Sequence, residues 1–287
     1  MDSRELLLDS LDQRGETYQE KLKRCRDDFS KDAVHDLRTS IRRLLAILDV
    51  VDFVISGSSV KKLSDRLKEQ LDDLSDLRDV QVMLDKVSEN INTLPEAEPL
   101  QNYLQKREKK KQRASENAVQ GVKPGGIHKR LIKIRQAVEE LSADEMRDKL
   151  PQAADKAYLT VMQRYGEVDP AQLTSIHHLR LAFKNFRYMI ETIYPCLPGF
   201  PESQLEQMHD YHTQMGDIHD VQVFLETLAE FAEENDSYDP GPVRRFYERI
   251  LAKDLSLYVK NKAEVLTFWR ANPLAAFPWE ADPDKKE

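Results

Sequence analysis

The chain has 287 residues, of which 40% are hydrophobic and 33% are charged, with nine glycines and only two cysteines. This length allows one large or two ordinary domains, the composition is typical of long amphipathic helices, and two cysteines exclude a disulfide framework. The N-terminus is charged within its first four residues, and Asp49 and Asp52 interrupt the longest apolar run, residues 44–55. We therefore expect a reduced, cytoplasmic protein with no secretion signal and no membrane partner.

Helical periodicity predicts helices along nearly the whole chain, with Gly, Ser and Pro residues at the breaks. The expected helices in the first half cover residues 4–28, 31–55, 59–92, 98–119 and 127–141. Those in the second half cover residues 144–166, 171–194, 202–235 and 240–270. From Pro273 onward the chain is rich in proline and charge, and we expect an irregular, mobile tail.

The two halves repeat two blocks of sequence. VHDLRTSIRR (34–43) matches IHHLRLAFKN (176–185), and DLRDVQVMLD (76–85) matches DIHDVQVFLE (217–226), at offsets of 142 and 141. Two matched blocks in the same order at nearly one offset indicate a duplication. We therefore predict a first helical bundle over residues 1–142, a second over residues 143–272 and a tail over residues 273–287.

The first matched block carries a cationic stripe in both halves. The stripes are His35, Arg38 and Arg42 with Arg43 beside them, and His177, Arg180, Lys184 and Arg187. The second stripe has spacings of three, four and three, so its side chains share one face of a helix. An exposed helix face would explain one such stripe, although like charges at these spacings cost a few tenths of a kcal/mol per pair.

Apolar residues flank the second stripe on both sides, which favours a cationic groove over a solvated face. Leu181 and Tyr188 lie on one side, and Phe183, Phe186 and Ile190 lie on the other. Cations in a groove need a counter-charge. Arginine and lysine suit phosphate oxygens, and helical turns spaced at about 5.4 Å suit a linear polyanion better than one small ion.

Two further patterns raise metal chemistry as an alternative. Asp76 and Asp79 recur as Asp217 and Asp220, and His-Asp doublets occur at residues 35–36, 209–210 and 219–220. The doublets suggest an HD-type metal-dependent phosphohydrolase, but no further ligands complete such a site. The favoured interpretation of the aspartates is that they orient neighbouring arginines, so we predict no metal, no cofactor and no catalytic residue.

Charge is strongly segregated along the chain, whose net charge is −8. Residues 101–135 carry +9, so the remainder carries −17, which indicates a positive field on an acidic body. Basic residues outside the stripes that could either face solvent or complete an anion site are Arg107, Arg130, Lys133, Arg245 and Arg249.

On these motifs the chain resembles the CHAD domain family, helical domains defined by their histidines. The resemblance rests on VHDLRTSIRR with DLRDVQV and on IHHLRLAFKNFRY with MGDIHDVQV, and it spans about residues 1–270. It implies two four-helix bundles related by pseudo-twofold symmetry around a basic channel. It also implies binding of inorganic polyphosphate and association with polyphosphate granules in prokaryotic cells.

The same resemblance assigns the channel lining residue by residue: His35, Arg38, Arg42, Arg43, Arg78, His177, Arg180, Lys184 and Arg187. Three positions depart from the family pattern, because Leu45 and Asn185 stand where arginine is common and His219 stands where the first half has Arg78. These departures would thin the cationic wall. The β-barrel triphosphatase often fused to this family is not present in this sequence, so the chain would act as a binder alone or beside such an enzyme in trans.

Taken together, these observations predict an all-α protein that binds inorganic polyphosphate without catalysis. The alternatives are the metal phosphohydrolase and a helical module for an acidic protein partner. Nucleic acid is disfavoured as a partner because aromatic residues are not interleaved with the cations.

Overall fold

The structure is a computed structural model that describes residues 3–55 and 57–280. It is all-α, as predicted, and the described residues contain no strand. The first six α-helices are α1 (Ser3–Asp27), α2 (Lys31–Ile55), α3 (Ser58–Asp73), α4 (Ser75–Asn90), α5 (Glu98–Gly121) and α6 (Pro124–Glu139). The other four are α7 (Ala143–Gly166), α8 (Leu173–Ile193), α9 (Ser203–Glu233) and α10 (Gly241–Asn261).

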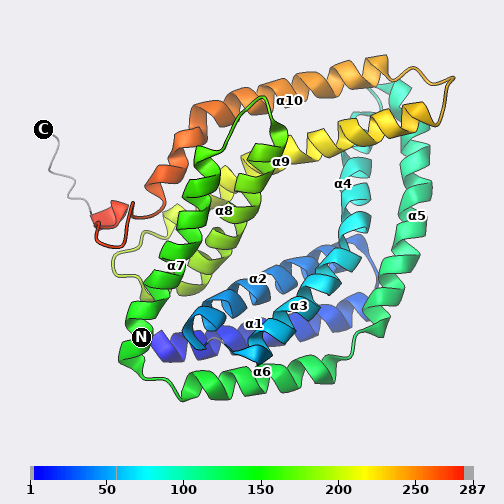
Figure 1. The fold of residues 1–287 in the computed structure, drawn as a ribbon. Coiled ribbons are helices and arrows are strands. Elements are labelled where there is room, and N and C mark those ends of the chain that lie inside the picture. The colour runs from blue at the N-terminus through cyan, green and yellow to red at the C-terminus, as the bar shows by residue number, and fades with distance from the viewer. Residues whose placement is uncertain (1–2, 56, 281–287) are drawn as a thin grey trace, which may run out of the picture.

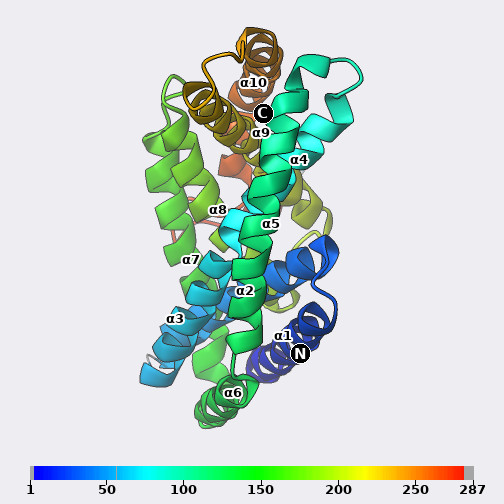
Figure 2. The same cartoon turned by 90° about the vertical axis from the view of Figure 1, so that its right-hand side faces the viewer.

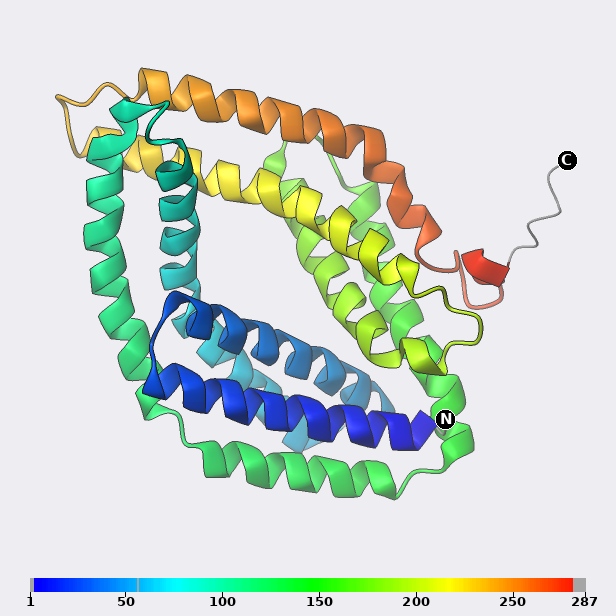
Figure 3. The same ribbon diagram turned by 180° about the vertical axis from the view of Figure 1, so that it is seen from behind.

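The helices form a four-sided frame (Figures 1 and 3). One side consists of α1, α2, α3 and α6, the next of α4 and α5, the third of α9 and α10, and the fourth of α7 and α8. Figure 2 shows the frame edge-on, with α5 running upright along the edge that faces the viewer. Helix α8 packs against both α2 and α9, and α4 packs against α2 and α9. Helices α2 and α4 of the first half therefore pack against α8 and α9 of the second half.

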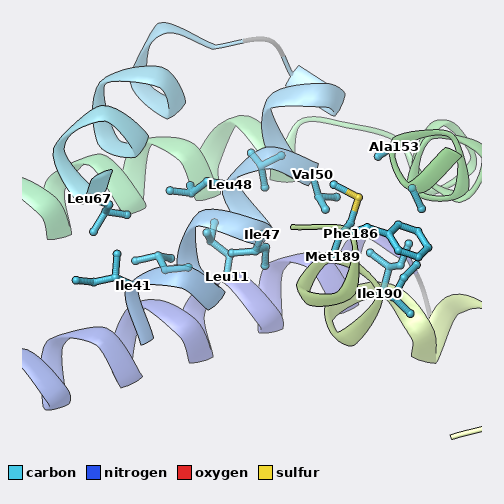
Figure 4. Close-up of a cluster of buried hydrophobic side chains, with 14 of the residues drawn as sticks. Leu11, Ile41, Ile47, Leu48, Val50, Leu67, Ala153, Phe186, Met189 and Ile190 are labelled. Atoms are coloured by element: carbon cyan, nitrogen blue, oxygen red, sulfur yellow. The ribbon is translucent and has the colours of Figure 1, made fainter. Parts of the chain in front are cut away.

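The hydrophobic core is shared by the two predicted halves. Val50 of α2 lies next to Phe186 and Met189 of α8 in the larger cluster of buried side chains (Figure 4). The smaller cluster joins α4 and α5 to α9 and α10, with Leu104 and Phe224 among its buried members. The predicted boundary at residue 142 thus falls between helices with a common core, and the pseudo-twofold relation stays a prediction.

The single helix expected over residues 59–92 is wrong, because α3 and α4 are two helices separated at Leu74. Leu74 is buried and closes α3 with its backbone N–H on the carbonyl of Leu71. The hydroxyl of Ser75 donates to the same carbonyl at 2.8 Å, and Arg38 Nη1 donates to it at 2.9 Å. These partners compensate the carbonyl for the lost helical bond, so α4 can turn away from α3 (Figure 1).

The last predicted helix ends earlier than expected, since α10 stops at Asn261 and a 3-10 turn, Lys262–Thr267, follows. Part of the predicted tail is packed. The rings of Phe277 and Trp279 stack at 4.5 Å, and Trp279 Nε1 donates to the carbonyl of Pro198 at 3.1 Å. Residues 281–287 of that tail lie outside the described residues.

Candidate anion-binding site

Helices α2, α4, α8 and α9 bring cationic and imidazole side chains from both halves together. We call this group the cationic cluster: Arg38, Arg42, Arg78, His177, Arg180, Lys184, Arg187, His212 and His219. The two stripes meet because the face of α8 that carries the second stripe packs between α2 and α9. The sequence patterns on two distant helices therefore describe one site.

Arg38 is held by the protein itself. Its side chain is 4% exposed, and Nη1 donates to the carbonyl of Leu71 at 2.9 Å and to the hydroxyl of Ser75 at 3.0 Å. Burial and the neighbouring Arg42 lower the pKa of this guanidinium to about 10. Arg38 thus has a structural role at the α3–α4 break as well as a place in the cluster.

Arg180 is the repeat counterpart of Arg38, but its surroundings differ. Gly216 occupies the position that matches Ser75, and a Cβ added there would stand 3.6 Å from Nε of Arg180. The guanidinium therefore lies close to the backbone of α9 at Gly216, and no side chain among the described residues forms a hydrogen bond with it. Burial lowers the pKa of Arg180, while the carboxylates of Asp220 and Asp79 raise it.

Buried polar atoms without partners are concentrated in the cationic cluster. Within residues 3–55 and 57–280, nine buried side-chain nitrogen or oxygen atoms have no hydrogen-bond partner, and five belong to this cluster. The five are Nδ1 of His177, Nε of Arg180, Nε of Arg187, Nε2 of His212 and Nδ1 of His219. Because most buried polar groups in folded proteins are paired, such a concentration indicates a site that awaits acceptor atoms.

Lys184 lies among several arginines of the cationic cluster. Burial, together with the charges of Arg42 and Arg180, lowers the pKa of its ammonium to about 6. No described residue forms a hydrogen bond or ion pair with its Nζ. Lys184 is therefore largely neutral at pH 7 and above while the site is empty.

The histidines are also held neutral. Burial and Arg180 lower the pKa of His212 to about 2, and burial and His177 lower that of His219 to about 4. The rings of His177 and His219 lie 4.1 Å apart between centroids. An anion among these rings would favour their charged forms.

Sequence comparison of the halves missed His212, because the repeat aligns it with Leu71. A signal for it does exist. His212, Gly216 and His219 are spaced by four and three residues and so share one face of α9. A search for single-helix faces would have found it where a search for repeated residues did not.

The paired aspartates have different cationic neighbours. Asp76 forms an ion pair with Lys111 of α5, whereas Asp79 and Asp220 lie near Arg180. Burial raises the pKa of Asp220, against the opposing effects of Lys86 and Arg180. The prediction that these aspartates orient arginines stays a prediction.

Other predicted site residues lie outside the cationic cluster. His35 and Arg43 border a pocket between α1 and α2, and Arg107 pairs with Glu230 of α9 at 3.7 Å. The remaining four lie on the outer helices, Arg130 and Lys133 on α6 and the exposed Arg245 and Arg249 on α10. Nε of Arg249 donates to the carbonyl of Arg245 at 3.2 Å.

In the described part of the chain, no three His, Cys, Asp or Glu side chains gather as a metal site would require. None of its helices combines the length and apolarity needed to cross a bilayer.

The sequence model of one protein family, the CHAD domain, matches residues 10–229. The chain belongs to the CHAD domain family. The fold agrees with the crystal structure of the CHAD domain from the plant Ricinus communis, at 17% identity and a TM-score of 0.66, over 91% of this chain and 88% of that one. It also agrees with PptA from Streptomyces chartreusis, at 15% identity and a TM-score of 0.65, over 92% of this chain and 98% of that one.

None of the curated proteins matches this CHAD domain chain. Because a plant CHAD domain is among the similar structures, membership of the family does not by itself place the chain in a prokaryote.

Proposed function

We propose that this CHAD domain protein binds inorganic polyphosphate through the cationic cluster and does not cleave it. The observation that carries the proposal is the group of five buried nitrogens beside Lys184 that have no hydrogen-bond partner in the described part of the chain. Phosphate oxygens would accept from the arginine donors and supply the missing negative charge. A chain of phosphates would reach the side chains of several helices at once.

The two alternatives fit the surroundings of the site less well. A metal ion at His177 and His219 would be repelled by Arg180, whose charge already lowers the pKa of both histidines. The surface of a folded acidic partner would need exposed cations, whereas Arg38 and Arg187 are 4% and 7% exposed. A thin, flexible polyanion reaches such groups more readily.

The test is a calorimetric titration of the metal-free protein with orthophosphate and with polyphosphates of increasing length. Wild type is compared with the double variant Arg180→Ala/Lys184→Ala. Binding should tighten with chain length, release no phosphate and be lost in the double variant. Affinity should also fall steeply with salt, by analogy with backbone-dominated nucleic-acid binding.

The matched control is Arg245→Ala/Arg249→Ala, which removes the same charge from the exposed face of α10 and should leave affinity unchanged. Absence of binding at low salt would remove the proposal and direct attention to an acidic protein. Metal-dependent release of phosphate would favour the hydrolase.

The same proposal extends to the protein's place in the cell. It would gather on polyphosphate granules, beside a triphosphatase or another polyphosphate-metabolising enzyme acting in trans. A fluorescent fusion should mark the granules, and the Arg180→Ala/Lys184→Ala fusion should be diffuse.

A further inference from the structure

A pocket of about 260 Å³ lies between α1 and α2, next to the cationic cluster. Helix α1 contributes Arg14 and Lys21 to its lining, and α2 contributes His35, Thr39 and Arg43. The α2 residues are spaced by four, so they form a stripe parallel to the stripe of cluster arginines on the same helix. Helix α2 therefore presents cations on two neighbouring lines.

The pocket has more positive than negative charge once its ion pairs are formed. Asp36, which also lines it, lies 3.3 Å from Lys21 and 2.9 Å from Arg24. Glu191 is shared in the same way, at 3.8 Å from Arg43 and 3.3 Å from Arg187. Each carboxylate thus already faces two cations.

Arg14 takes no part in the ion pairs of Asp36 and Glu191. No hydrogen bond or ion pair joins its guanidinium to a residue in the described part of the chain, although it is half-buried. Burial lowers its pKa, and Arg43 lowers it further, while Glu191 acts in the opposite direction. A half-buried guanidinium that faces another arginine needs an anion.

The pocket also offers uncommitted donors. The hydroxyl of Thr17 already donates to a backbone carbonyl at 2.7 Å, but the hydroxyl of Thr39 forms no such bond within residues 3–55 and 57–280. Burial and the charge of Arg78 lower the pKa of His35, and a nearby anion would act in the opposite direction. Guanidinium, hydroxyl and imidazole donors around one cavity suit the tetrahedral oxygens of a phosphoryl group.

Two residues, His35 and Glu191, lie between the pocket and the cationic cluster. His35 lines the pocket and lies close enough to Arg78 and Arg38 for their charges to lower its pKa. Glu191 bridges Arg43 at the pocket and Arg187 in the cluster. A chain bound in the cluster could therefore end here.

We propose that the α1–α2 pocket is a second anion site, in which Arg14, Thr39 and Arg43 bind one phosphoryl group or a pyrophosphate-sized anion. The group comes either from the end of a polyphosphate chain held in the cluster or from a free small phosphate. Only the first source rests on the proposed function.

The test titrates inorganic pyrophosphate and polyphosphates of defined short and long lengths into wild type, Arg14→Gln and Thr39→Val. Lys23→Gln is the matched control, because Lys23 is exposed elsewhere on α1 and carries the same charge. Arg14→Gln should weaken pyrophosphate binding about tenfold, as expected when a charge-assisted bond is lost. Thr39→Val, which conserves shape, should weaken it less, and Lys23→Gln should leave it unchanged.

The cluster variant Arg180→Ala/Lys184→Ala separates this proposal from the proposed function. It should abolish binding of long chains but keep pyrophosphate affinity within about twofold, because the pocket is intact. A chain-end source predicts that Arg14→Gln weakens short chains more than long ones, since short chains have more ends per phosphate. A free-phosphate source predicts weakening for pyrophosphate alone.

The proposal is overturned if Arg14→Gln and Lys23→Gln bind both pyrophosphate and short chains equally well. It is also overturned if the cluster variant, and not Arg14→Gln, abolishes pyrophosphate binding, because the small anion would then occupy the cluster. Thermal unfolding of each variant shows whether a loss of binding reflects a loss of fold.

Discussion

Lys184, a residue of the proposed polyphosphate site, opposes folding at neutral pH. Its ammonium is charged in the unfolded chain but has a folded pKa of about 6, so between about pH 6 and pH 10 the unfolded state binds the extra proton. This difference costs stability, and the cost grows as the pH falls through that window. We predict that Lys184→Met raises the melting temperature at pH 7 by roughly 2–4 °C, the shift expected of about 1 kcal/mol in a chain of this size.

Thermal unfolding at pH 7 and pH 10 checks this prediction, and the gain should be smaller at pH 10. The same variant should bind polyphosphate more weakly, because the ligand loses a cation. A variant that melts below wild type at pH 7 would show that packing around the lysine, and not its charge, dominates.

The lowered pKa of Lys184 also predicts how polyphosphate binding depends on pH. A bound polyanion raises the pKa of Lys184 above its free value of about 6, and it acts in the same direction on His219, whose free value is about 4. The extra affinity from Lys184 is therefore fully present below about pH 6 and is lost as the pH rises through the bound-state pKa. We predict weaker binding at pH 8 than at pH 6, with proton uptake at pH 7.

Titration calorimetry in buffers of different ionisation enthalpy measures this uptake directly. Lys184→Arg is the informative variant, because arginine stays charged throughout this range and should flatten the pH profile. An unchanged profile in Lys184→Arg would assign the pH dependence to another group.

At the scale of the helices, the sequence predicts which residues share a helix face, but not which helices pack against one another. The stripes on α2 and α8 follow from the helical period and the repeat, and the structure brings both into one cluster. The break at Leu74 could not be predicted, because neither proline nor glycine marks it and one donor to the Leu71 carbonyl, Arg38, comes from the distant helix α2. The period likewise places Arg245 and Arg249 on one face of α10, but not which helices that face meets.

The repeat also predicts a difference between equivalent arginines. Arg38 donates to Leu71 and Ser75 at the α3–α4 break, whereas Nε of Arg180 is buried without a partner. We predict that Arg38→Ala costs about 2 kcal/mol of unfolding free energy, because the Leu71 carbonyl and the Ser75 hydroxyl each lose a charged donor. Arg180→Ala should cost less, since burial already disfavours the charge of Arg180 and its Nε makes no hydrogen bond within residues 3–55 and 57–280.

Urea unfolding of the two variants at pH 7 measures the difference as a shift in midpoint at constant slope. Polyphosphate titration of the same variants should rank them differently, with Arg180→Ala losing more affinity for its small change in stability. Equal destabilisation of both variants would mean that the second-half arginine also has a structural role.

Across the whole molecule, charge is divided between segments of the sequence, whereas the hydrophobic core is shared by both halves. Charge follows the sequence, with +9 over residues 101–135 and −17 elsewhere, yet most of that basic segment lies on α5 and α6, outside the cationic cluster. The cluster instead contains cations from an otherwise acidic remainder. Net charge along the chain therefore indicates a positive field without placing it, whereas the position of the stripes within the repeats predicts which helices carry the cationic cluster.

The shared core leads to a prediction about the two halves. Val50 and Ile47 of α2 are fully buried in the cluster that contains Phe186 and Ile190 of α8, and the smaller core likewise joins α4 and α5 to α9 and α10. A fragment of residues 1–142 would expose these apolar faces to water, and burial of such faces provides most of the stability of a helical domain. We predict that this fragment shows helical circular dichroism but no cooperative thermal transition, and that it binds a dye for exposed apolar surface.

The fragment of residues 143–272 should behave in the same way, because α8 loses its packing against α2. Mixing the two fragments should restore a cooperative transition and polyphosphate binding together, since the cationic cluster needs helices from both. A sharp, dye-free melting transition in the isolated first fragment would contradict this, and it would mean that the duplicated half kept a fold of its own and that the shared core was added to two bundles already complete.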